Sequence, residues 1–174
     1  WIRCHFQKSP TDIFTEKLDE FMRKNGLAAG LSRPFHDLRD IGAYYSQAQS
    51  AVELGQYRDN SKVLHSFDQV TQYYALRLCS NHIRLSELCH PALLWLMEYD
   101  RKKNTDYTQT LYVYLNKQGN QIESADTLCI HRATLIYRLA KIHELTMLDL
   151  KDADTVNQLN MSFMILKLLG KFSS

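Results

Sequence analysis

Long hydrophobic runs are absent from this chain of 174 residues, which excludes a membrane-spanning helix of the usual length. No signal peptide is recognisable, so a reducing cytoplasm is the expected setting. The 4 cysteines show no Cys-x-x-Cys spacing and no histidine partners at zinc-finger intervals, which argues against a metal cluster. The cysteines expected to be small buried apolar residues are Cys4, Cys79, Cys89 and Cys129.

Glycine and histidine patterns that accompany catalysis are also missing. The sequence has no glycine-rich phosphate loop and no Gly-x-Ser-x-Gly turn, and its serines, aspartates and cysteines form no recognisable nucleophile arrangement. The 7 histidines are scattered, without a His-x-x-x-His or His-Glu-x-x-His run, and are expected at the surface or hydrogen-bonded. We therefore expect no enzyme activity, no catalytic residue, no metal and no cofactor.

Charge of one sign is also scarce, because the net charge is only +2. Any contact with nucleic acid must then come from local placement of arginine and lysine rather than from a general positive field. The length and the 45% hydrophobic content fit one ordinary core or two small ones. The chain begins at Trp1 without an initiator methionine, so we expect a piece of a longer polypeptide.

The first part of the chain alternates strand and helix patterns, which predicts a mixed α/β order. The expected elements are strands or apolar runs at 1–6, 27–31 and 63–67 and helices at 11–24 and 38–54. Ser9-Pro10 offers a cap and a first-turn proline, Asn25-Gly26 a left-handed stop, and Gly55 the end of the second helix. A face expected to pack on a sheet is formed by Ile41, Tyr44, Tyr45, Ala48, Ala51 and Val52.

From about Val70 onward the pattern is helical, and His90-Pro91 is the next clear boundary because proline suits a first helical turn. We expect a module boundary near residues 82 to 90. Helices are expected at about 91–100, 106–117, 121–128, 131–144 and 153–169. The last carries a wide apolar stripe, which either packs within its own module or faces another chain: Val156, Leu159, Met161, Phe163, Met164, Ile165, Leu166, Leu168 and Leu169.

Residues 119 to 145 contain two short amphipathic helices separated by a tight turn, a helix-turn-helix pattern that points to DNA. The first begins with an N-cap at Asn120. Glu123, three residues later, completes a capping pattern in which each side chain accepts from a backbone N–H. Ala125 is small where two helices must cross closely. Apolar contacts that fix the helices are expected from Leu128, Ile130, Leu135, Leu139 and Ile142.

The second of these helices has a wet, basic face. At about 100° per residue, the polar side chains of its middle turns lie within roughly 60° of Thr134. No acid occurs between residues 131 and 143, so this face suits a major-groove reader. An amphipathic helix whose solvated face happens to be basic is the alternative. The candidate DNA-contacting residues are His131, Arg132, Thr134, Tyr137, Arg138 and Lys141.

Two neighbouring features have weaker implications. Arg101-Lys102-Lys103, expected between two helices, is either a clamp for a flanking phosphate or a solvated loop. The tyrosines at 107, 112 and 114 lie beside an expected core pair of leucines and are interpreted as packing residues with wet hydroxyl groups.

The anchors of the second part resemble the PucR and sugar-diacid regulator group of bacterial transcription factors: His90-Pro91, Tyr99-Asp100, Thr110-Leu111, Ala125, Leu128 and the run 131–139. That group's recognition helix carries a signature similar to His-Arg-Asn-Thr-Leu-x-Tyr-Arg-Leu, and the resemblance covers about 90 to 155. It implies a DNA-binding helix-turn-helix module, with an upstream sensory domain expected to be missing here. Ala133 replaces the usual asparagine, which implies a different preferred operator. Cys129 stands in a turn where glycine is often preferred, which implies a different backbone geometry or a small strain.

Further upstream, residues 30–35 and 45–51 resemble the later half of the degenerate GGDEF-like domain that precedes this module in the group. The chain has no adjacent glycine pair, so the loop that would hold a nucleotide triphosphate and its metal is absent. The resemblance implies an α+β fold for a partial GGDEF-like module at 1–85, followed by an all-α, PucR-type helix-turn-helix module at 86–174.

We therefore predict a C-terminal fragment of a sequence-specific transcriptional regulator that binds double-stranded DNA, with helix 131–144 in the major groove. Base edges or nearby phosphates are assigned to His131, Arg132 and Thr134, and backbone phosphates mainly to Tyr137, Arg138 and Lys141. A homodimer on paired half-sites is expected, because one such helix makes few phosphate contacts. The alternatives are a helical interaction or dimerisation module without direct DNA binding, and a nucleotide-binding or catalytic α/β part.

Overall fold

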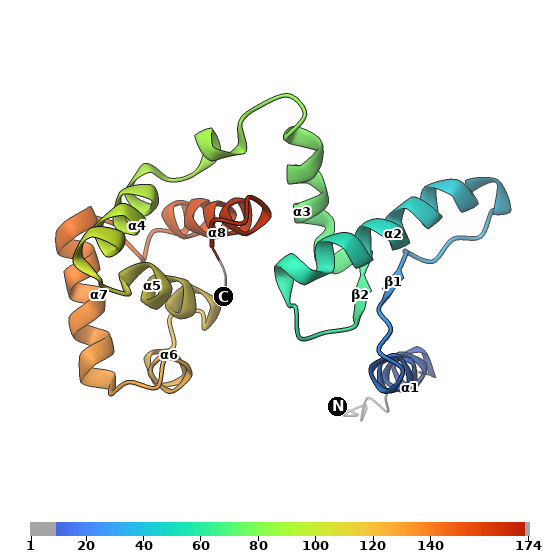
Figure 1. The fold of residues 1–174 in the computed structure, drawn as a ribbon, viewed down its shortest axis with the longest axis horizontal. Coiled ribbons are helices and arrows are strands. Elements are labelled where there is room, and N and C mark those ends of the chain that lie inside the picture. Colours follow the sequence, from blue (N-terminus) through green and yellow to red (C-terminus); the bar gives the residue numbers. More distant parts are fainter. Residues whose placement is uncertain (1–9, 173–174) are drawn as a thin grey trace, which may run out of the picture. The chain divides into compact units, whose positions relative to one another are not determined.

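The structure, a computed structural model, describes residues 10–172. It divides into two compact units, Trp1–Leu78 and Cys79–Ser174, whose elements are labelled in Figure 1. This division precedes the boundary region of 82 to 90 that the sequence suggests. The predicted strand at 1–6, together with Cys4 and the cap at Ser9, lies outside the described residues.

The first unit is a small α/β arrangement. Its elements are α1 (Pro10–Lys24), β1 (Ala29–Leu31), the 3-10 helix η1 (Leu38–Asp40), α2 (Ile41–Arg58), β2 (Leu64–Ser66) and α3 (Phe67–Cys79). β1 and β2 pair in parallel, with Gly30 opposite His65. α2 connects the two strands and contacts both of them. The left-handed stop after α1 is confirmed, since Gly26 has a φ of 65°.

Two glycines allow backbone and side chains to approach α2 closely. A Cβ added at Gly30 would lie 1.9 Å from the carbonyl oxygen of Ala48, and one at Gly55 would lie 2.1 Å from Cγ of His65. The helix end predicted at Gly55 is therefore wrong: α2 continues to Arg58, and this glycine serves close packing instead. Burial in this contact region lowers the pKa of His65, because desolvation disfavours the charged imidazole.

The apolar face predicted for α2 is buried only in part. Ala51 is fully buried, whereas Ile41 and Tyr45 are 56% and 70% exposed. The packing prediction is wrong for these two residues. The two described strands are short and approach α2 near Ala48 and Gly55, so nothing in the described part of the sheet covers its N-terminal turns.

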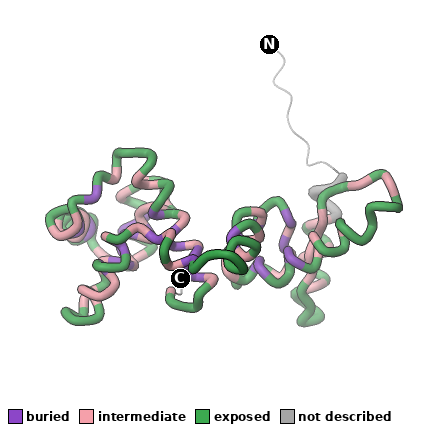
Figure 2. The backbone as a smooth tube through the Cα atoms, turned by 90° about the horizontal axis from the view of Figure 1, so that it is seen from above, coloured by how far each residue is buried: buried purple, intermediate pink, exposed green. Residues whose placement is uncertain are grey.

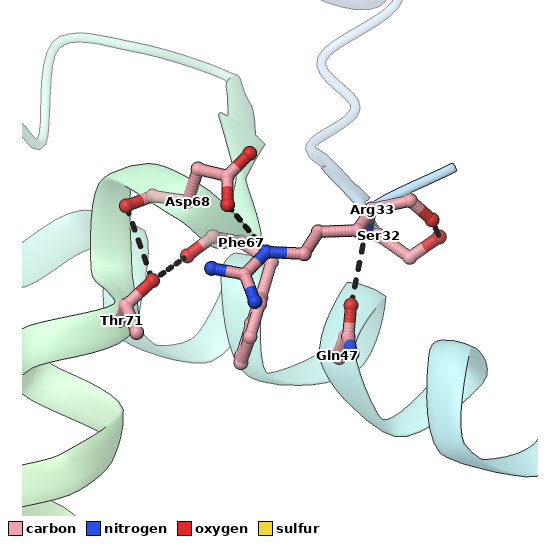
Figure 3. Close-up of polar contacts among 6 residues, drawn as sticks. All are labelled: Ser32, Arg33, Gln47, Phe67, Asp68 and Thr71. Carbon is pink, nitrogen blue, oxygen red and sulfur yellow. Dashed lines mark hydrogen bonds and ion pairs between the residues drawn. The ribbon is translucent and has the colours of Figure 1, made fainter. Parts of the chain in front are cut away.

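Arg33, which follows β1, links three elements of the first unit (Figure 3). Its backbone N–H donates to Oε1 of Gln47 in α2 at 3.1 Å, and its Nε donates to Oδ1 of Asp68 in α3 at 2.6 Å. The guanidinium carbon also lies 5.6 Å from the ring centre of Phe67. Both partners of the ion pair are exposed, so it contributes about 1 kcal/mol or less.

The second unit is helical in all its regular elements between residues 79 and 172. They are η2 (Leu85–Leu88), α4 (Pro91–Lys103), α5 (Tyr107–Asn116), α6 (Gln121–Thr127), α7 (Arg132–Thr146) and α8 (Ala153–Leu168). The helices predicted for this part are confirmed, with ends shifted by a few residues. The helix start predicted at His90-Pro91 is also confirmed. Nδ1 of His90 accepts from the backbone N–H of Ala92 at 3.2 Å, and Pro91 occupies the first turn of α4.

α5 is the central helix of this unit, because it contacts α4, α6, α7 and α8. Buried and exposed positions alternate along the helices (Figure 2), as amphipathic helices around a shared core require. Four of the nine residues of the wide stripe on α8 are buried: Leu159, Phe163, Ile165 and Leu166 are at most 3% exposed. The centre of the stripe is thus a core feature, whereas its other residues are half-buried or exposed.

The N-terminus of α5 is capped from α4. The Asp100 carboxylate accepts hydrogen bonds from the backbone N–H groups of Tyr107 at 3.0 Å and Thr108 at 2.7 Å. It also accepts one from the hydroxyl of Thr105 at 2.5 Å. Asp106, the residue directly before the helix, makes no side-chain capping bond. A carboxylate from the preceding helix therefore caps α5 and ties its first turn to α4.

Two further expectations concern membrane segments and cysteines. Within residues 10–172, no helix is both long enough and apolar enough to cross a membrane. Cys89 is buried as predicted, but Cys79 and Cys129 are exposed, so the prediction that each cysteine is a buried apolar residue is wrong for these two. Both stand at or just beyond the end of a helix.

Candidate nucleic-acid interface

α6 begins with the cap that its sequence predicts. The Asn120 side chain accepts from the backbone N–H groups of Ile122 at 3.1 Å and Glu123 at 3.3 Å. The reciprocal half of the predicted pattern is wrong, because the Glu123 carboxylate accepts from Nδ2 of Asn120 at 2.6 Å. The Asn120 backbone N–H is already used, since it donates to the carbonyl oxygen of Lys117. The start of α6 is therefore fixed by a capping side chain that Glu123 holds in place.

The turn between α6 and α7 is a Schellman motif. The backbone N–H of Ile130 donates to the carbonyl oxygen of Ala125 at 3.0 Å, and the backbone N–H of Cys129 donates to the carbonyl oxygen of Asp126 at 3.1 Å. Cys129 has a φ of 53°, in the left-handed region that favours glycine. The turn thus keeps the backbone geometry of a glycine turn, with a residue whose Cβ makes that conformation less favourable.

α7 is held against the unit by its apolar side. Leu135 and Ile142 are fully buried, and Leu139 is half-buried. α7 contacts α4, α5 and α6. Ala125 of α6 is only 3% exposed, which agrees with its predicted place at a close helix crossing. Figure 1 shows α6 and α7 as consecutive helices joined by the short turn.

The predicted DNA contacts lie on or directly before α7, but they differ in exposure. The exposed ones are His131, Arg132, Thr134 and Tyr137, and the half-buried ones are Arg138 and Lys141. His131 is the N-cap residue and makes no side-chain capping bond. The N-terminal turn of α7 is therefore open to solvent, whereas the cations of its middle turns are partly covered.

Arg132 is exposed but oriented. Its Nε and Nη2 both donate to Oε1 of Gln121, at 3.1 and 2.9 Å, and Gln121 is the first residue of α6. This pair of bonds connects the N-terminal turns of the two helices across 11 residues of sequence. A guanidinium carries more N–H donors than one amide oxygen accepts, so Arg132 can bind a second acceptor while Gln121 holds it.

The other two cations are engaged within the unit. Nη1 of Arg138 donates to Oγ1 of the buried Thr110 in α5 at 3.1 Å. Nζ of Lys141 pairs with Glu144 at 2.8 Å, and this hydrogen bond raises the pKa of Lys141. Burial raises the pKa of Tyr107, with smaller contributions from nearby tyrosines. Arg138 therefore extends toward α5, whereas Lys141 is paired within α7.

Gln121 and Thr110 are site residues that reasoning from sequence missed. Each lies on a different helix from the arginine that it holds, and helical periodicity relates only residues of one helix. No signal in the sequence pairs Gln121 with Arg132 or Thr110 with Arg138. The capping prediction did locate the first turn of α6, the turn that carries Gln121.

The basic run at residues 101 to 103 forms the last turn of α4 rather than a loop. Glu98, one turn earlier, pairs with Arg101 at 2.7 Å and with Lys102 at 3.2 Å. Hydrogen bonds from these two cations lower the pKa of Glu98 to about 2. The loop expectation is wrong, and two of the three cations share one acid on the same helix, which offsets one of their charges.

Comparisons with known proteins agree with this geometry. Residues 107–165, which begin with α5 and end within α8, match the family described as the PucR C-terminal helix-turn-helix domain. The chain is 26% identical over 94% of its length to the proline-responsive transcriptional activator PutR of Bacillus subtilis (strain 168). It is 27% identical over 84% of its length to the purine catabolism regulatory protein of the same organism.

A third relative in that organism is the DNA-binding transcriptional activator AdeR, 25% identical over 69% of this chain. The chain spans only 36%, 27% and 29% of the lengths of PutR, the purine catabolism regulatory protein and AdeR, respectively. No solved structure matches the chain. Residues 107–165 of the second unit are therefore similar to the PucR C-terminal helix-turn-helix domain, and the chain as a whole is similar to transcriptional regulators.

Proposed function

We propose that this chain is the DNA-binding part of a transcriptional regulator, with α7 in the major groove and α6 across the DNA backbone. The observation that carries the proposal is the open N-terminal turn of α7, where Arg132 is exposed yet held by Gln121. Helix-turn-helix proteins reach base edges with the N-terminal residues of such a second helix. The match to the PucR C-terminal domain and the named regulators among the relatives support the same function.

We propose the roles of the candidate residues from the sequence pattern, and their exposure supports most of them. Base edges or nearby phosphates are assigned to the exposed His131, Arg132 and Thr134, and backbone phosphates mainly to Tyr137, Arg138 and Lys141. The hydrogen bonds from Arg138 to Thr110 and from Lys141 to Glu144 hold these two cations in place. This favours contacts to phosphates, which position the protein on the DNA, over contacts that read the bases. An arginine held at a fixed place along a helix flank suits a phosphate, whose position does not depend on the base sequence.

The test is a titration of a duplex recovered by selection from a random pool, using the whole chain and single variants. Arg132→Ala should relax base preference, because base contacts carry specificity. Arg138→Ala should weaken binding to every duplex and reduce the slope of log affinity against log salt by about 1. Lys151→Ala, which removes an exposed cation outside α7, is the matched control. Unchanged titrations for both arginine variants would remove the assignment.

We further infer that the chain acts as a homodimer on half-sites about one DNA turn apart, because a single such helix makes few phosphate contacts. The main face of α8 is not available for that contact, since Leu159, Phe163 and Leu166 are buried within the chain. Sedimentation with and without the selected duplex is the measurement. A monomer under both conditions at high protein concentration would contradict the dimer.

We also propose that the first unit is a remnant of a GGDEF-like domain over about residues 1–85, followed by the DNA-binding module over about 86–174. The parallel β1-α2-β2 arrangement and the resemblance of residues 30–35 and 45–51 support this proposal. A degenerate domain without the glycine-pair loop should show no rise in Tm with purine nucleotides. A clear rise would instead favour the nucleotide-binding alternative.

A further inference from the structure

The side of α7 that is most open to solvent is largely apolar. Ala133, Ile136, Tyr137 and Ala140 are all exposed, and Ile136 and Tyr137 retain 45% and 63% of their accessible surface. Their spacing of three, four and seven residues places them on one side of the helix. We call these four residues the outer strip. It lies away from the buried Leu135 and Ile142, and Tyr137 is the residue that it shares with the basic face predicted from the sequence.

Cations border the outer strip on both sides. At about 100° per residue, Arg132 lies about 40° beyond Ile136, and Lys141 lies about 40° beyond Tyr137 on the opposite side. Arg132 is anchored to Gln121, and Lys141 is anchored to Glu144. The acid of α7 is the exposed Glu144, which follows Ala140 by one turn and pairs with Lys141 at 2.8 Å, so the uncompensated positive charge beside the strip is that of Arg132. The charge distribution therefore fits a polyanionic partner that also offers an apolar feature to the centre of the strip.

The major groove of DNA offers this combination. Phosphates line its two edges, and the C5 methyl group of thymine is an apolar feature that its floor presents to a protein. A second copy of this helix fits less well, because its own bordering cations would meet those of the first copy. The strip has few hydrogen-bonding groups at its centre, so it cannot distinguish bases there by their donors and acceptors.

We propose that the outer strip of α7 contacts thymine methyl groups, with Ile136 as the principal contact, so that Ile136 determines specificity for thymine within the site. This inference rests on the proposed function. It adds an apolar selection for one base to the polar contacts assigned to His131, Arg132 and Thr134. The preferred duplex then contains a thymine at the position facing the second turn of α7.

The experiment replaces each thymine of the selected duplex by uracil, which removes only the C5 methyl group. For the whole wild-type chain, one replacement should weaken binding about threefold to fivefold, as expected for loss of one buried methyl group. Ile136→Ala should bind the thymine duplex more weakly and should respond little to that same replacement. Leu38→Ala, which truncates a residue 77% exposed in the first unit, is the matched control and should keep the wild-type response.

The outcomes separate this inference from the function on which it rests. Failure of the wild-type chain to enrich any duplex would contradict the proposed function itself. Tight binding of a selected duplex with no sensitivity to uracil at any position would overturn the methyl contact and leave the DNA-binding proposal intact. A change in sedimentation of Ile136→Ala, with unaltered DNA affinity, would assign the strip to self-association and also overturn the inference. Circular dichroism of each variant verifies that it remains helical.

Discussion

At the scale of single residues, the two arginines of α7 differ in what holds them. Arg132 is exposed and anchored by an amide on the neighbouring helix, whereas Arg138 is half-buried and anchored by a buried hydroxyl in α5. An anchored guanidinium has lost part of its rotational freedom before it meets a ligand, so less entropy is lost on binding. The anchors themselves should therefore affect DNA recognition, although we assign no direct DNA contact to them.

Gln121→Ala tests this anchoring. Loss of the amide acceptor should let Arg132 sample several orientations, and the ratio of specific to unspecific affinity should fall about fivefold, as expected for one lost hydrogen bond. Titration of the selected duplex and of a shuffled duplex measures this ratio. Gln121→Glu keeps an acceptor for Arg132 and adds a negative charge, so it should weaken binding to both duplexes alike. An unchanged ratio for Gln121→Ala would show that the anchor has no role in recognition.

Cys129 supports a second prediction at this scale. Its φ of 53° disfavours a residue with a Cβ, so Cys129→Gly should raise the free energy of unfolding by about 0.5 to 1 kcal/mol. Chemical denaturation of the whole chain is the measurement. The control is Cys79→Gly, which places glycine in the last turn of α3 and should be neutral or destabilising. A destabilising effect of Cys129→Gly would mean that the cysteine side chain contributes more than the strain that it causes.

At the scale of elements, the helix-turn-helix depends on α5, because this helix contacts every other long helix of its unit. The cap that Asp100 provides sets the start of α5, and Thr110 of α5 in turn holds Arg138. The packing of α4 against α5 is thus connected to Arg138 of α7 through two contacts, the Asp100 cap and the hydrogen bond between Thr110 and Arg138. Damage to the α4 and α5 junction should lower both the stability of the unit and its affinity for DNA.

Asp100→Ala should lower the free energy of unfolding by about 1 to 2 kcal/mol, since a charged cap of two backbone N–H groups is lost. Asp106→Ala is the matched control. This second aspartate stands directly before α5 but makes no side-chain capping bond, so its removal should change stability by no more than about 0.5 kcal/mol. Equal effects of the two substitutions in chemical denaturation would contradict the capping role of Asp100.

The elements themselves were largely predictable, for local reasons. Asn120 and His90-Pro91 mark helix starts through short-range chemistry, and the apolar periodicity of residues 131 to 144 identifies α7. Gly55 was misread because its role depends on His65, a residue on another element. Gln121 and Thr110 were missed for the same reason. Contacts between helices depend on packing geometry, and a pattern within one helix does not contain that information.

At the scale of the whole molecule, the chain consists of two compact units, and the boundary between them in the sequence lies between Leu78 and Cys79. Residues 78–84 are all exposed, and η2 begins only at Leu85. A backbone segment without burial opens easily to a protease, whereas the helices on each side are protected by their cores. We therefore expect a protease to cut this junction, between α3 and η2, before it cuts the helices on each side.

Limited trypsin digestion of the whole chain should cut first at Arg84, which is exposed in this segment. The expected product begins at Leu85 and retains α4 to α8 with their helical circular dichroism. Arg84→Gln should slow this cleavage without changing the helical signal. Rapid cleavage within α5 or α7 before the junction would contradict the division into two independently packed units.

The most direct measurement of the central claim, that the open N-terminal turn of α7 reads duplex DNA, is selection by the whole chain from a random pool. We expect enrichment of one motif, with preference at one or more of its positions lost when Arg132→Ala is used instead of wild type. We also expect paired copies of that motif about one DNA turn apart. Recovery of no motif by the wild-type chain, or of an identical motif by Arg132→Ala, would contradict reading of DNA by this turn.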